Sequence, residues 1–179
     1  QVAELQPPHL AAMCIWEGAA DYYRDMAHHG GIMSTFSRAW YGPYVVMLQN
    51  GLGENGLRSS MTDDWVSGPE TLTADQLAAN RNDWHDDVLS NPLATDEFWT
   101  SRRPEFSKIT VPLLSAGNWG GNGLHLRGNI EGFLAAASDQ KWLEIHGLEH
   151  WTHFYTDYGV DLQRRFFDHF LKDEDTGWS

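Results

Sequence analysis

His150 is the residue of this sequence whose position best suits catalysis. It lies just beyond the apolar segment 141–146, which is expected to be a buried strand, and before the last helical pattern of the chain. An imidazole titrates near neutral pH, so a histidine in such a loop can take up and return a proton during a reaction. The alternative is a structural histidine in a tight loop, and the sequence leaves both open.

Nearby histidines raise the question of a metal site. His146 and His153 flank His150 at four and three residues, and the His-His pair at 28–29 could add ligands. However, His146 ends a strand and His150 lies in a loop, so this spacing does not place them on one helical face. A single cysteine excludes a thiolate cluster and an internal disulfide. We therefore expect no metal and no cofactor.

No serine has the sequence surroundings of a hydrolase nucleophile. A serine on a sharp strand-to-helix turn is typically found in G-x-S-x-G, and this motif is absent from the sequence. Neither Ser115 nor Ser60 is flanked by both of its glycines. The glycine-rich stretch 120–123 lacks the lysine and the spacing of a phosphate loop, so we expect its glycines to bring backbone close to a ligand.

The elements that would position these residues alternate between strands and helices. Apolar runs at 10–16, 111–116 and 141–146 end in glycine or small polar clusters, as buried strands do. Cys14 lies inside the first run and is expected to be buried and unreactive. Apolar residues recur at helical spacing after the second and third runs, at positions 126, 130, 133, 134 and 137 and at 162, 166, 167, 170 and 171. This order predicts an α/β fold with a parallel sheet.

Ligands of such sheets bind beyond the carboxyl ends of the strands. Three loops follow the expected strands, at 16–18, 117–121 and 147–151, and each carries a tryptophan: Trp16, Trp119 and Trp151. Nine tryptophans in 179 residues is a high number. Because indole rings often line binding pockets, we expect these three to contact a substrate.

The segment 30–106 differs from the rest of the chain. It is rich in glycine, proline and tryptophan, and it contains no convincing strand. One helix is expected there: Thr73 and Gln76 form a capping box, Leu77, Trp84 and Val88 form an apolar stripe, and the helix stops at 91–92, Asn-Pro. A mostly helical insertion of this length between two strands predicts a cap or lid over the site.

Several of these segments, in the same order, resemble the Xaa-Pro dipeptidyl-peptidase-like hydrolases, which include cocaine-esterase-type acyl hydrolases. The resembling segments are 7–25 (PPHLAAMCIWEGAADYYRD), 29–32 (HGGI), 111–121 (VPLLSAGNWGG), 146–151 (HGLEHW) and 163–171 (QRRFFDHFL). The resemblance implies the C-terminal part of an α/β-hydrolase fold. The core would comprise 1–29 and 107–179, and a helical cap would comprise 30–106.

The resemblance also implies a mechanism. His150 would be the general base of a Ser-His-acid triad. The family acid belongs in the loop after 111–116, where this sequence has asparagines, so Asn118 or Asn122 could orient the imidazole without a charge. Glu149 and Asp157 are the nearest carboxylates in sequence. The resemblance places the serine, the early strands and a C-terminal β domain outside this chain.

The expected partners follow from the net charge of the chain and from the parts of the hydrolase fold that the resemblance places outside it. A net charge of −13 without a Lys/Arg cluster argues against nucleic acid, and no apolar run reaches the ~18–20 residues of a membrane span. We expect a small-molecule ester or peptide substrate. Unpaired sheet edges predict association with the missing part of the fold or with a second copy. The alternative function is a non-catalytic ligand-binding or assembly module.

Overall fold

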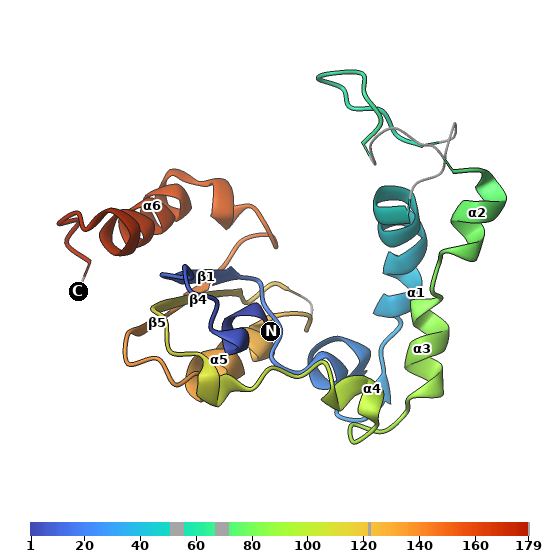
Figure 1. Cartoon of the computed structure of the whole chain (residues 1–179), viewed down its shortest axis with the longest axis horizontal. Helices are drawn as coiled ribbons and strands as arrows, with labels where there is room; N and C mark the ends of the chain where they lie inside the picture. Colours follow the sequence, from blue (N-terminus) through green and yellow to red (C-terminus); the bar gives the residue numbers. More distant parts are fainter. Residues whose placement is uncertain (51–55, 67–71, 122, 179) are drawn as a thin grey trace.

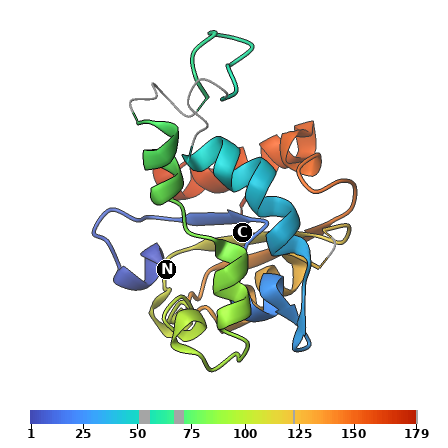
Figure 2. The same cartoon turned by 90° about the vertical axis from the view of Figure 1, so that its right-hand side faces the viewer.

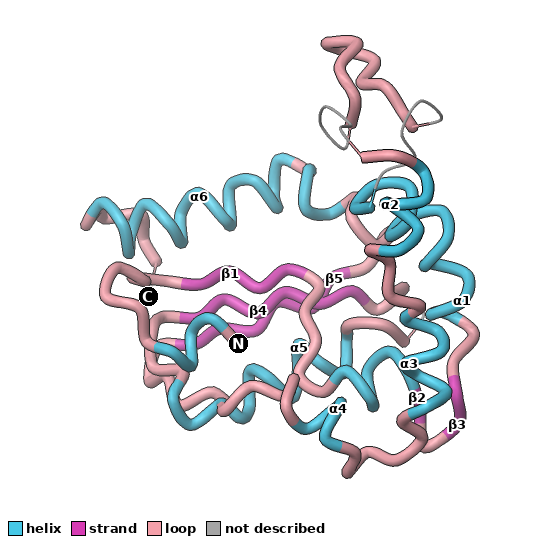
Figure 3. The backbone as a smooth tube through the Cα atoms, turned by 45° about the vertical axis from the view of Figure 1, so that its right-hand side comes forward, coloured by secondary structure: helices cyan, strands magenta, loops and turns pink. Residues whose placement is uncertain are grey.

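The computed structural model describes residues 1–50, 56–66, 72–121 and 123–178. Its core is a three-stranded parallel sheet of β1 (Met13–Trp16), β4 (Leu113–Asn118) and β5 (Lys141–His146), in the order β1-β4-β5. Helix α5 (Leu126–Ala135) covers one face of the sheet and α6 (Asp157–Lys172) the other (Figures 1 and 3). The structure therefore confirms the predicted α/β class. None of the described helices is long and apolar enough to cross a membrane.

Two strands differ from the predicted ranges. β1 begins at Met13, because its pairing with β4 begins there, at Leu113. β4 begins after Pro112, which has no N–H to donate, and it continues through Gly117 to Asn118 because both residues pair with the end of β5. The third strand has the predicted bounds.

The described part of the segment between the first two core strands lies beside the sheet in Figure 1 and in front of it in Figure 2. It begins with η2 (Tyr23–Ala27) and the short hairpin β2–β3 (His28–His29 and Ile32–Met33), which is strand structure that the sequence analysis did not expect. The helical elements that follow are α1 (Phe36–Trp40), η3 (Tyr41–Asn50), α2 (Ala74–Ala79), α3 (Trp84–Ser90) and α4 (Glu97–Thr100). Short 3-10 turns complete the chain: η1 (Val2–Leu5), η5 (Phe106–Lys108) and η6 (His153–Tyr155). The boundaries 29/30 and 106/107 stay a prediction.

The single helix predicted from Thr73 to residue 91 is wrong, because the structure has two helices there. The capping box at Thr73 and Gln76 is confirmed, but α2 ends at Ala79. Asp83 then starts α3, since its carboxylate accepts hydrogen bonds from the backbone amides of His85 and Asp86. Leu77 and Val88 of the predicted apolar stripe are both buried.

Polar side chains fix the segment that follows β1 against α5. Asn129 accepts from the Gly18 amide at 2.9 Å and donates to the Ile15 carbonyl at 3.1 Å. Asp25 is buried, accepts from the amides of residues 20 and 21, and forms an ion pair with Arg127 at 2.6 Å. Gly128 lets α5 approach this segment closely.

We expect Gly128→Ala to lower the free energy of unfolding by about 2 kcal/mol or more, because overpacking forces the backbone to move. A Cβ at this position would lie 2.6 Å from the Ala19 Cα and 2.8 Å from an Asp25 carboxylate oxygen. Gly132→Ala on the same helix is the control, since its Cβ would meet nothing closer than 3.5 Å. Urea unfolding of both variants tests this, and equal stabilities would contradict it.

Candidate active site at the carboxyl edge of the sheet

The parallel register brings the three predicted loops to one edge of the sheet. Trp16 at the end of β1 pairs with Ala116, and His146 at the end of β5 pairs with Asn118. The residues that follow these strands therefore emerge side by side. Glu17, Asn118 and His150 meet at this edge.

His150 lies between buried polar groups and open space. Its side chain is 29% exposed and lines a cavity of about 1300 Å³. Its ring packs against the ring of His125 at 5.0 Å and edge-on to Trp151 at 4.9 Å between centroids. Burial lowers the pKa of His150 from its ordinary value, which favours the neutral imidazole. A neutral imidazole is the form that can accept a proton.

Asn118 shapes the loop that carries His150. The residue is fully buried, and its Nδ2 donates to the backbone carbonyls of Gly147 at 3.0 Å, Leu148 at 3.2 Å and Glu149 at 3.3 Å. The amide is thus committed to the loop backbone, and its influence on the imidazole is indirect. Asn122, the other asparagine expected to orient the imidazole, lies outside the described residues.

Glu17 lies in the loop 16–18 that was expected at the site, but no role for its side chain was predicted from the sequence. It directly follows β1, its side chain is 8% exposed, and its carboxylate lies 3.9 Å from His150 Nδ1 and 3.3 Å from His146 Nε2. Burial raises the pKa of Glu17 to about 7, against the opposing effect of the Asn118 backbone amide. Its φ of 60° lies in the left-handed region, which costs about 1–2 kcal/mol for a residue with a Cβ.

The two carboxylates nearest to His150 in sequence lie elsewhere. Glu149 accepts a hydrogen bond from the Thr152 hydroxyl at 3.1 Å, and Asp157 is exposed in the first turn of α6. The signal for Glu17 was present in the sequence, because it is an acid directly after a buried strand. Only the register of the sheet shows that this acid reaches a loop more than 130 residues later.

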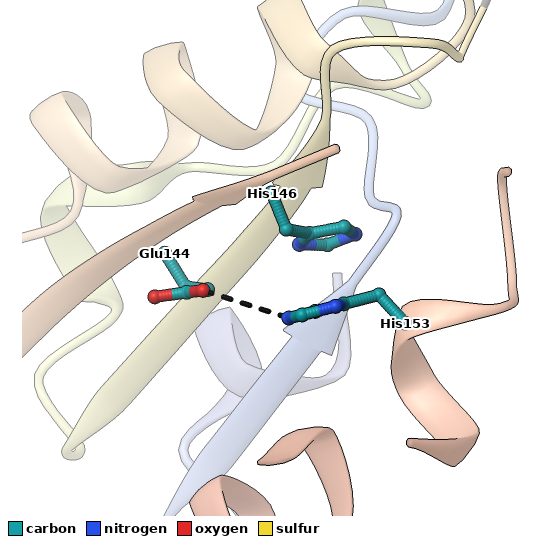
Figure 4. A group of neighbouring side chains, drawn as sticks. All are labelled: Glu144, His146 and His153. Carbon is teal, nitrogen blue, oxygen red and sulfur yellow. Dashed lines mark ion pairs between the residues drawn. The ribbon is translucent and has the colours of Figure 1, made fainter. Parts of the chain in front are cut away.

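A second histidine group lies next to Glu17. Ligand atoms of Glu144, His146 and His153 lie within 4.8 Å of one another, and the buried nitrogens of both histidines lack hydrogen-bond partners among the described residues. Figure 4 shows the two rings stacked face to face, with centroids 4.6 Å apart and planes 16° from parallel. A metal must lie in the plane of each imidazole that binds it, and stacked rings share no such plane. This arrangement does not fit a metal centre.

The cavity beside His150 has a volume of about 1300 Å³ and aromatic walls. The core contributes His125, His150 and Trp151, and the other side includes Tyr22, Phe36, Trp40, Tyr41, Trp84, Phe98 and Trp99. Of the three tryptophans expected to contact a substrate, Trp151 lines the cavity. Trp119 is 71% exposed, and Trp16 packs on His146 and Phe154, so neither is among the described lining residues.

Comparison with known proteins gives the site a family context. Residues 1–155 match the family model for X-Pro dipeptidyl-peptidase (S15 family). Two crystal structures of a CocE/NonD family hydrolase from Staphylococcus aureus superimpose with a TM-score of 0.71 at 35% sequence identity, over 97% of this chain. The alignments cover 27% and 26% of those chains, so this chain spans about a quarter of their length. A search of curated proteins found no match.

The ring stacking leads to a prediction about metals. We expect removal of divalent cations by a chelator to leave the melting temperature unchanged, because the stacked rings of His146 and His153 cannot both direct a nitrogen lone pair at one ion. Differential scanning calorimetry before and after dialysis against EDTA measures this. Stoichiometric zinc in the purified protein, with a lower melting temperature after chelation, would show that the rings reorient around an ion.

Proposed function

The chain belongs to the X-Pro dipeptidyl-peptidase (S15) family, and on this premise we propose that it is the histidine-bearing part of a serine hydrolase that cleaves ester or amide bonds. The observation that carries this proposal is the place of His150. A neutral imidazole at the carboxyl edge of a parallel sheet, in the loop after the strand and before the final helix, faces a cavity large enough for a substrate.

In this proposal His150 is the general base and then the general acid. It takes the proton of a serine hydroxyl as the oxygen attacks the substrate carbonyl, and it returns the proton to the leaving group. The serine comes from outside these 179 residues, since the sequence lacks G-x-S-x-G. Ser115 is buried with its hydroxyl donated to the Asn129 carbonyl, and Ser37 is buried with its hydroxyl 3.1 Å from His85 Nδ1.

The cavity supports a substrate with an apolar or aromatic group. Most of its named walls are rings of Trp, Tyr and Phe, which bind flat apolar groups well. One observation favours the second candidate function, a ligand-binding module without catalysis: a neutral asparagine ends β4, the strand after which the family acid is expected. The same cavity would then hold a ligand that is not cleaved.

We expect this chain alone to leave p-nitrophenyl acetate unhydrolysed, and a protein that joins it to the serine-bearing segment of its family to hydrolyse the ester. In the joined protein, His150→Ala should reduce turnover by about 10³-fold or more, because loss of the base leaves only binding and oxyanion effects. His9→Ala is the control, because His9 is exposed. Turnover of His150→Ala within a few-fold of the parent would reject His150 as the base.

We also propose that the chain associates, either with the rest of the fold or with a second copy. β1 pairs only with β4 in the described sheet, and its residues Met13–Trp16 carry no charge that would protect the free edge. The net charge of −13 opposes disordered aggregation, so we expect a defined oligomer or complex. Light scattering at low micromolar concentration tests this. A cooperatively melting monomer of the 20.3 kDa chain would contradict it.

A further inference from the structure

The carboxylate of Glu17 lies between two imidazoles. Its Oε1 is 3.3 Å from His146 Nε2, and its Oε2 is 3.9 Å from His150 Nδ1. Both oxygens are buried and without a hydrogen bond to a side chain of the described residues. Within the described part of the chain, no other carboxylate lies within 4 Å of a His150 ring nitrogen.

We propose that Glu17 is the positioning residue of His150, and that it acts from the end of β1 in place of an acid after β4. This inference rests on the proposed role of His150 as general base. The separation of 3.9 Å is longer than a hydrogen bond, as catalytic pairs often are before substrate binds. A hydrogen bond would require the two atoms to approach by roughly 1 Å.

The chemistry follows from which imidazole nitrogen carries the proton. With Nδ1–H directed at Glu17, Nε2 keeps its lone pair and can accept the serine proton as the serine oxygen bonds to the carbonyl carbon. The imidazolium that forms is then stabilised by the neighbouring carboxylate. Nε2 gives the same proton to the leaving group as the bond to that group breaks, so an ionised Glu17 gains no proton during the cycle.

His146 lies beside the other carboxylate oxygen and carries no charge that would neutralise it. Burial, with the nearby His153 and His150, lowers the pKa of His146 to about 4, so its ring is neutral at physiological pH. His125, the other titratable ring against His150, has its Nδ1 3.2 Å from the Gly18 carbonyl, and burial lowers its pKa. Neither ring supplies a charge that competes with His150 for Glu17.

The ring ¹⁵N chemical shifts of the histidines, measured by NMR on this chain, test the inference without an activity assay. Above about pH 8, where a carboxyl with a pKa of about 7 is ionised, we expect His150 to carry its proton on Nδ1. In Glu17→Gln we expect the pKa of His150 to fall by less than about 1 pH unit, because Glu17 is only partly ionised where His150 titrates and the two titrations are coupled. Glu149→Gln, adjacent in sequence but bonded to Thr152, is the matched control and should leave that pKa unchanged.

Two results would overturn the inference. One is a wild-type His150 with its proton on Nε2 at high pH, a measurement that needs no variant to fold. The other is a Glu17→Gln protein in which the resonances of His146 move while the pKa of His150 stays the same. If the pairing is found and the joined protein hydrolyses no ester, the proposed function fails and the pairing stands.

Discussion

β4 is hydrogen-bonded to a parallel strand on each of its edges, and all six of its residues are buried. This double pairing places the ends of β1 and β5 next to the end of β4, because paired residues of parallel strands lie side by side. Loops that are distant in sequence are thereby held at one edge. Asn118, the last residue of β4, extends this control into the His150 loop through three hydrogen bonds to its backbone carbonyls.

The same edge concentrates groups that reduce stability. Glu17 is a buried carboxyl group without a hydrogen bond to a described side chain, and its backbone is left-handed. Burying a polar group without partners and holding a residue at positive φ both cost free energy. The packing of Asn129 and of the Asp25–Arg127 ion pair holds the segment after β1 in place and offsets part of that cost. Groups held in this way are typical of functional sites.

Local patterns were sufficient to predict much of the core from the sequence. Apolar runs located the three strands, helical spacing located α5 and α6, and the capping box at Thr73 was found because it involves residues three positions apart. The break before Asp83 was missed because the apolar stripe continues across it while the backbone does not. The meeting of Glu17 with His150 and the distribution of the tryptophans depend on register and tertiary packing, which no local pattern contains.

The cavity divides its walls between two parts of the chain with different chemistry. The core side brings the imidazoles of His125 and His150, and the segment that includes α1, α3 and α4 brings aromatic rings and few charges. In the proposed hydrolase this separates two tasks. In that proposal, rings such as Trp40 and Trp84 would contact parts of the substrate that do not react, so their contribution would be the same in the ground state and the transition state. His150 acts only on the bond that is broken. Substitutions among the aromatic rings would therefore change which substrate binds, and the reaction at His150 would stay the same.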